Sequence, residues 1–298
     1  MTVMDSQIGD GMSGAQSHVM QGLAAQRPRE WSWSDYLSTL SYFAYFEVKK
    51  RYADNILGLL WSALSPLVQL GTYVFVFAVV LDIRFPKAHG QVGGTLDFTF
   101  YVLMGLVAWQ LLVTSLTGGL SMIHNYAGFI RQPNFPYRML PMVVVLSTMP
   151  GHLIGLLMVL VLALVTGALH SVQVPLLLLF YGFSFLFLCG LSTTLGFLVV
   201  KVTDLRHAVP LVLNLLMFLS PILYKPEQVP AAFQFVTYAN PLAYYVATFK
   251  YALTGDSSMC IKGPFVDLVV LMLMGGFFWA IQGVLWRKIR TVGIDDVA

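Results

Sequence analysis

Residues 49–81 read KKRYADNILGLLWSALSPLVQLGTYVFVFAVVL. The last 27 of them, from Asn55 to Leu81, contain no Asp, Glu, Lys or Arg. A helix needs about 20 apolar residues to cross the ~30 Å hydrocarbon layer of a bilayer, so this stretch predicts a transmembrane helix over residues 57–81. A Lys or Arg at the bilayer centre costs roughly 2.5–3.5 kcal/mol. Lys49, Lys50 and Arg51 are therefore expected at the membrane surface, on the cytoplasmic side.

The composition extends this conclusion to the whole chain. Hydrophobic residues make up 57% and charged residues 10%, against about 25% charged in soluble proteins. We therefore expect an all-α polytopic membrane protein. The net charge of +3 is too small to indicate nucleic-acid binding. The two cysteines, Cys189 and Cys260, lack metal-ligand spacing and predict free thiols, with no metal site.

Charge-free runs predict six membrane spans in a single domain covering residues 31–298. Residues 1–30 are rich in Gly, Ser and Gln without an apolar core, so they predict a disordered cytoplasmic tail rather than a signal peptide. The 62-residue run Met139–Val200 is too long for one helix and predicts a hairpin that breaks near Gly167–Val174. The six spans are expected over residues 57–81, 98–123, 139–167, 175–200, 208–224 and 265–286.

The distribution of Lys and Arg orients these spans. With the N-terminus inside, twelve basic residues fall in cytoplasmic segments and five outside, the five being Arg84, Lys87, Lys225, Lys250 and Lys262. Cytoplasmic loops carry an excess of Lys and Arg, and the cluster Arg287–Arg290 independently orients the last span. Both termini are therefore expected in the cytoplasm.

Two further segments are expected to be helical without spanning the membrane. Residues 34–52 carry Leu37, Leu40, Phe43, Ala44, Phe46 and Val48 at helical spacing, which predicts an amphipathic helix along the inner interface. Ser32 and Asp35 match a capping-box start for it. Residues 225–263 form a long, aromatic-rich external connection, which predicts one or two short helices that re-enter the outer half of the bilayer.

The sequence lacks the residues that several classes of membrane protein need for their function. The chain has no GxxxxGK[ST] loop to hold ATP and no TVGYG-type filter. The expected spans carry no acidic residue at mid-depth, which disfavours an ion-coupled carrier. Ser192 with the distant His152 could form an intramembrane serine protease, although small residues in a span usually serve helix packing. Membrane spans without an ATP site or an ion-coupling group indicate a transport pathway whose energy a partner protein must supply.

Three blocks of sequence carry a family resemblance. The first is EVKKRY at 47–52, followed by LGLLW at 57–61 and LSPL at 64–67. The second is FIRQPNFP at 129–136, and the third is VTDLRH at 202–207 with FLSPILY at 218–224 and NPL at 240–242. From about residue 40 to 286 the chain resembles the permease subunits of polysaccharide-exporting ABC transporters. O-antigen exporters are most similar, with teichoic-acid exporters next and capsule exporters less similar around the first span.

The resemblance implies a non-catalytic permease of the bacterial inner membrane that moves a lipid-linked, polyprenyl-diphosphate-bound glycan outward. It implies a second copy of the chain and two ATPase subunits as partners, with ATP and Mg²⁺ bound by the ATPases and no cofactor in this chain. Residues 124–138 would contain the coupling helix, although Gln132–Asn134 replaces the family's basic pair. The implied ATPase contacts are Asn125, Phe129, Ile130, Arg131 and Arg138.

Two further roles are implied for the substrate. Lys49, Lys50 and Arg51 would attract the diphosphate headgroup, or would serve only as topology anchors. Aromatic side chains offer a sugar chain an uncharged sliding surface, and residues 225–263 would form outer gate helices. The candidate conduit and gate aromatics are Tyr101, Trp109, Tyr224, Tyr244, Tyr245 and Phe249.

Other functions remain open at this stage. A teichoic-acid or capsule exporter fits the same motifs, and a related ABC permease could export a drug or lipid. A membrane-embedded enzyme acting on lipid-linked sugars would need an acidic or His cluster at one membrane face. The isolated Asp82, Asp97, Asp204 and Asp267 form no obvious cluster in the sequence.

Overall fold

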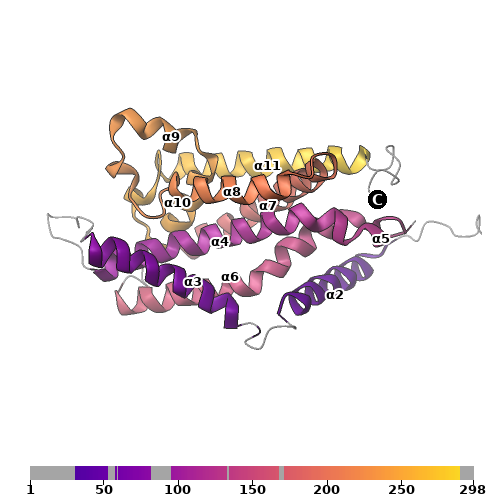
Figure 1. Cartoon of the computed structure of the whole chain (residues 1–298), viewed down its shortest axis with the longest axis horizontal. Helices are drawn as coiled ribbons and strands as arrows, with labels where there is room; N and C mark the ends of the chain where they lie inside the picture. The colour runs from indigo at the N-terminus through magenta and orange to yellow at the C-terminus, as the bar shows by residue number, and fades with distance from the viewer. Residues whose placement is uncertain are drawn as a thin grey trace, which may run out of the picture.

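The computed structural model describes residues 31–52, 58, 60–81, 95–132, 134–167 and 171–288. All regular elements in these ranges are helices, and Figure 1 shows the longer ones lying side by side. The expected N-terminal tail, residues 1–30, lies outside the described residues, as do Asp82, Arg84, Lys87 and Arg290.

Four helices among the described residues are long and apolar enough to cross a membrane. They are α4 (Thr95–Asn125), α6 (Leu140–Val165) with the preceding turn η3 (Tyr137–Met139), α7 (Val174–Lys201) and α11 (Pro264–Lys288). They confirm long apolar helices at the second, third, fourth and sixth expected positions. The break between α6 and α7 also lies where the sequence predicts it, at residues 166–173.

The first and fifth expected spans are shorter apolar helices. Helix α3 (Leu60–Tyr73) runs directly into the π-helix η1 (Val74–Val80), and the residues just before α3 are largely outside the described ranges. Helix α8 (Leu205–Phe218) has 14 residues, or about 21 Å at 1.5 Å per residue. The fifth span, expected over residues 208–224, therefore ends six residues early. Pro221, which has no N–H to continue a helix, follows the end of α8.

Helix α2 (Trp33–Tyr52) forms where the sequence predicts it and packs against α6. Its first turn closes with a hydrogen bond from the Tyr36 N–H to the Ser32 carbonyl, 3.0 Å long. The expected single apolar face divides in two. Leu40 is buried and Phe43, Ala44 and Val48 are half-buried, whereas Leu37 and Phe46 are exposed together with Trp33, Tyr42 and Tyr45.

The connection between α8 and α11 contains short helices, as expected. These are η5 (Pro226–Gln228), η6 (Ala231–Phe233), α9 (Gln234–Ala239), α10 (Pro241–Thr254) and η7 (Ser257–Met259). Helix α10 is buried along most of its length because it packs against α4, α7 and α11. It lies at the opposite end of the molecule from α5 (Ala127–Ile130) (Figure 1).

Glycines permit close contacts between the long helices. A Cβ atom on Gly190 of α7 would lie 2.3 Å from the carbonyl carbon of Phe278 on α11. A Cβ atom on Gly119 of α4 would lie 2.6 Å from the Ser192 Cβ on α7. Small residues of this kind let membrane helices approach closely, where apolar side chains alone give little specificity. They position α4, α7 and α11 around one core.

Candidate functional site

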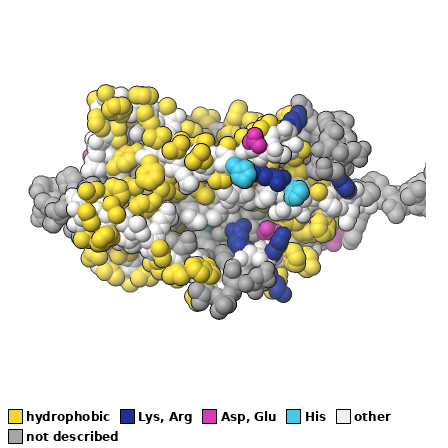
Figure 2. Space-filling view, viewed as in Figure 1, with side chains coloured by type: hydrophobic (Ala, Val, Ile, Leu, Met, Phe, Trp, Pro, Cys, Tyr) yellow, Lys and Arg dark blue, Asp and Glu magenta, His cyan; other side chains and the backbone are white. Residues whose placement is uncertain are grey.

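Charged side chains gather at one part of the molecular surface. In Figure 2 the Lys, Arg and His side chains lie mainly in the half that holds α2 and α5, and the opposite half is largely hydrophobic. Basic residues at the end of α2, around α5 and between α7 and α8 are exposed, namely Lys49, Lys50, Arg131, Arg138, Lys201, Arg206 and His207. This charged end is one candidate functional region.

A compact turn joins α4 to α6 at the charged end, and we name residues 125–138 the turn segment. Helix α4 ends at Asn125, and α5 follows Tyr126 as a single helical turn. Asn125, Phe129, Arg131 and Arg138 are exposed, with Phe129 41% exposed, whereas Ile130 is buried. The structure thus brings four of the five expected ATPase-contact residues to the surface and uses Ile130 as an anchor.

The three basic residues at the end of α2 differ in their surroundings. Lys49 and Lys50 are exposed. Arg51 is half-buried, and its Nη2 donates a hydrogen bond of 3.4 Å to the Ser147 Oγ on α6. Arg51 therefore helps to hold α2 on α6, and Lys49 and Lys50 present their charge to the surroundings.

The end of the molecule opposite the charged end contains a buried lysine that the sequence did not single out. Lys250 of α10, which the sequence places among the external charges, is fully buried. Its Nζ donates to the Pro221 carbonyl at 2.6 Å and to the Ile222 carbonyl at 3.4 Å. The same Nζ lies 3.1 Å from the centroid of the Tyr101 ring, a cation–π geometry. Lys250 thereby joins α10, α4 and the turn after α8.

Tyr101 completes this cluster from α4. Its hydroxyl donates to the Tyr224 carbonyl at 2.6 Å and lies 3.1 Å from the Pro221 carbonyl. The unwound residues after α8 are therefore bonded by side chains from two other helices. This matters because backbone polar groups that are buried in protein need hydrogen-bond partners.

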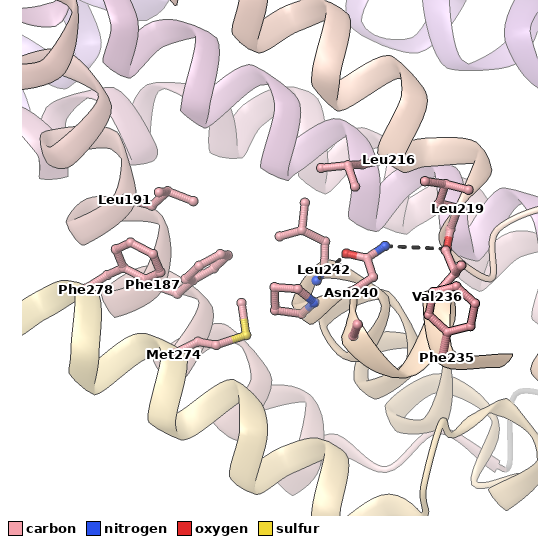
Figure 3. A pocket seen from close by; sticks show the side chains of 12 residues that line it. Phe187, Leu191, Leu216, Leu219, Phe235, Val236, Asn240, Leu242, Met274 and Phe278 are labelled. Atoms are coloured by element: carbon pink, nitrogen blue, oxygen red, sulfur yellow. Dashed lines mark hydrogen bonds between the residues drawn. The ribbon is translucent and has the colours of Figure 1, made fainter. Parts of the chain in front are cut away.

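Asn240 makes a second connection to the same turn. Its Oδ1 accepts the Leu242 N–H at 3.0 Å and so caps α10, and its Nδ2 donates to the Ser220 Oγ at 3.0 Å. The sequence blocks 218–224 and 240–242 are thus in direct contact. Beside them lies an apolar pocket of about 470 Å³ between α7, α8, α9, α10 and α11 (Figure 3).

Comparison with known proteins identifies the family. A model of the ABC-2 type transporter family matches residues 39–254, well over half of the chain. The chain belongs to the ABC-2 type transporter family. As a member it is a multi-pass, non-catalytic permease subunit of the cytoplasmic membrane, and this kind of permease works with ATPase subunits.

Three relatives of this ABC-2 permease are named "O-antigen export system permease protein RfbA". A relative from Myxococcus xanthus is 31% identical over 181 residues, covering 60% of this chain and 65% of its own length. Two from Klebsiella pneumoniae are 27% and 26% identical over 208 residues, covering 68% of this chain and 75% of their own. The match thus spans just under two thirds of the Myxococcus protein.

Most of the aromatic residues expected along a conduit lie inside the permease. Tyr101, Trp109, Tyr244, Tyr245 and Phe249 are buried, and only Tyr224 is half-exposed. Phe180 of α7 lies 5.1 Å from both Tyr245 and Phe249 between ring centroids. The structure gives these side chains packing roles within one subunit, and a conduit role for them stays a prediction.

His152, Ser192 and Asp267, which the sequence suggests as candidate enzyme residues, form hydrogen bonds to other groups in the permease. The His152 Nε2 lies 2.8 Å from the Tyr181 hydroxyl, and the Ser192 Oγ donates to the Ser115 carbonyl at 3.0 Å. Neither side chain is engaged with the other as a catalytic pair would be. Asp267 of α11 accepts the N–H groups of Ile261 and Lys262 at 2.7 and 3.1 Å and holds the preceding loop.

Proposed function

We propose that this chain is the membrane-spanning subunit of an ATP-driven exporter for a lipid-linked, O-antigen-type polysaccharide. The observation that carries the proposal is the family match together with relatives named as O-antigen export permeases. The geometry supports it because the two ends of the molecule differ. One end presents exposed cations and a projecting turn, and the other holds a buried helix, α10, bonded to an unwound turn.

The proposed topology has six membrane crossings with both termini in the cytoplasm of a bacterium. The four long helices provide four crossings. The continuous helical stretch α3–η1 provides the first, and α8 with the unwound residues 219–224 provides the fifth. Helix α10 would re-enter from the outer side, and α2 would lie along the inner interface with its exposed apolar residues in the lipid boundary.

The proposed assembly contains two copies of this chain and two ATPase subunits. The ATPases would bind ATP and Mg²⁺, and the turn segment would be their docking surface. Asn125, Phe129, Arg131 and Arg138 support this because they are exposed within the turn segment, in which Ile130 is buried. Lys49 and Lys50 would meet the diphosphate of the glycan lipid, since clustered cations at the cytoplasmic surface attract anionic headgroups.

The test is reconstitution of this chain with its partner ATPase in sealed vesicles. The substrate probe is polyprenyl-diphosphate-linked glycan extracted from the cells that produce the protein. We expect glycan to reach the protected side only with hydrolysable ATP, and a Walker-lysine variant of the ATPase serves as the matched control. ATP hydrolysis without glycan movement by the complete complex would refute the proposed substrate.

A further inference from the structure

Helix α2 and the turn segment contact each other through a cluster of aromatic rings. The Phe43 ring of α2 lies 5.9 Å from Tyr126, 5.2 Å from Phe129 and 5.5 Å from Phe135, between ring centroids. Phe129 and Phe135 lie 5.5 Å apart. These separations are typical of attractive aromatic pairs. One side chain of α2 is therefore inserted among three rings of the turn segment.

Polar contacts fix the same two elements in register. The Tyr126 hydroxyl donates to the Glu47 Oε2 at 2.7 Å, and the Nε1 of Trp31, two residues before α2 begins, donates to the Asn134 carbonyl at 2.9 Å. Burial, reinforced by the hydrogen bond to Glu47, raises the pKa of Tyr126 above its usual range. The hydroxyl therefore stays protonated and remains a donor to Glu47 at physiological pH.

Helix α2 also has a packing partner outside the turn segment. It packs on α6, where Leu40 is buried and the Tyr36 hydroxyl lies 3.6 Å from the Met142 sulfur. The contacts of Phe43 and Glu47 are additional, and they lie directly beside α5, the element exposed to a docking partner. The hydrogen bond between the Glu47 carboxylate and the Tyr126 phenol, together with the adjacent aromatic cluster, fixes the position of α2 relative to the turn segment. A fixed contact of this kind is required if motion is to pass from one element to the other.

We propose that Phe43, Glu47 and Tyr126 join α2 to the turn segment as one mechanical unit, so that α2 moves when a partner ATPase moves α5. These three are positioning residues, because they connect the docking element to the helix that carries Lys49 and Lys50. The inference rests on the proposed function, in which the turn segment is the docking surface. It adds the route by which α2, the helix that carries Lys49 and Lys50, is moved.

The experiment follows α2 and the turn segment separately in the complex with the ATPase. Nitroxide labels are placed at Ser38→Cys on α2 or Gln132→Cys in the turn segment, both exposed positions, in a chain carrying Cys189→Ala and Cys260→Ala. Pulsed electron paramagnetic resonance measures the label-to-label distance between the two copies, with and without ATP. In the otherwise native chain, we expect both distances to shift when ATP binds.

The decisive variants are Tyr126→Phe, which removes one hydroxyl, and Phe43→Ala. In each, the shift at Gln132→Cys should persist and the shift at Ser38→Cys should fall by at least half. Glu47→Ala should behave like Tyr126→Phe, and Glu47→Gln, which keeps an acceptor for the phenol, should restore the shift. Tyr36→Phe, which alters only the contact with α6, is the matched control and should retain both shifts.

The outcomes separate the inference from the function on which it rests. An undiminished Ser38→Cys shift in Tyr126→Phe and Phe43→Ala would overturn the inference, because motion would then reach α2 through α6. Failure of both labels to shift in the native complex would overturn the proposed docking surface as well. Loss of the Gln132→Cys shift in the variants would also overturn the inference, since these residues would then be needed for docking itself.

Discussion

Lys250 is an ionisable side chain enclosed by protein at the end of the molecule opposite α5. An ionisable group buried in a membrane protein is costly and by default has a function. Its partners are two backbone carbonyls and the Tyr101 ring, all contributed by other elements. These contacts replace the water that the amino group loses, so the side chain links α10, α4 and the turn after α8.

We predict that Lys250→Met lowers the stability of the purified protein. The substitution keeps a long unbranched side chain but removes every donor to the Pro221 and Ile222 carbonyls. Leaving buried carbonyls without their donor costs roughly 1–3 kcal/mol, which should lower the melting temperature in detergent by several degrees. Lys262→Met, at an exposed lysine of the same region, is the control and should change it little. An unchanged or higher melting temperature for Lys250→Met would mean that the cost of burying the amino group equals or exceeds the stabilisation from its hydrogen bonds.

The sequence does not distinguish Lys250 from the other external lysines. A lone lysine among aromatic and small residues is compatible with either burial or exposure, and its partners lie 28 and 29 residues away in the chain. Glu47 and Tyr126 present the same difficulty across 79 residues. The exposed basic residues and the turn segment were predictable because their placement follows from charge and from local sequence alone.

Helices α7 and α11 approach closely at Gly190 of α7, which has no side chain. The position of Gly190 leaves no room for a Cβ, which would lie 2.3 Å from a backbone atom of α11. A flexible side chain could move aside, but a helix backbone moves only if the two helices separate. Close approach of this pair therefore requires glycine at residue 190.

We predict that Gly190→Ala destabilises the helix pair. Overpacking typically costs 1–3 kcal/mol, so the folded yield in membranes and the melting temperature should both fall. Gly182→Ala on the same helix is the matched control, because a Cβ added there would have nothing within 4 Å, and alanine favours helix by about 1 kcal/mol over glycine. Equal stability of the two variants would contradict the proposed close contact.

The ends of the helices are the part of the fold that the sequence predicts least well. The charge-free run after Ala208 continues to Tyr224 and predicts a fifth span as far as that residue, whereas α8 stops at Phe218. The signal that corrects it is Ser220–Pro221, because a residue before proline is disfavoured in the helical conformation. Hydrophobicity marks residues that avoid water, but hydrogen-bonding capacity decides where a helix ends.

At the scale of the whole molecule, composition and charge placement are sufficient for the fold class. An apolar, charge-poor chain must satisfy its backbone internally, which in a membrane favours helices. The neighbours of each helix are not predictable in this way, because they depend on glycine contacts such as Gly119 with Ser192 and on the burial of α10. Two of the basic residues that orient the chain, Lys49 and Lys50, are also the proposed contacts for the glycan-lipid headgroup.

We predict that the double variant Lys49→Ala/Lys50→Ala weakens the interaction with the glycan lipid. Both side chains are exposed, so the change removes charge without opening a cavity. Arg51 is left unchanged because it bonds Ser147 on α6. Each Lys near an anionic surface contributes about 1 kcal/mol, so the apparent KM for lipid-linked glycan in reconstituted vesicles should rise roughly ten- to thirtyfold.

Salt and a matched variant separate this headgroup role from a purely topological one. Raising ionic strength should increase the KM of the native complex and barely affect the double variant, because exposed charges are screened. Lys262→Ala, at the opposite end of the molecule, should leave both the KM and its salt dependence unchanged. The amount of protein in the membrane must stay constant, since Arg131, Arg138, Lys201 and Arg206 still mark the cytoplasmic side. A native KM in the double variant would leave Lys49 and Lys50 as topology anchors only.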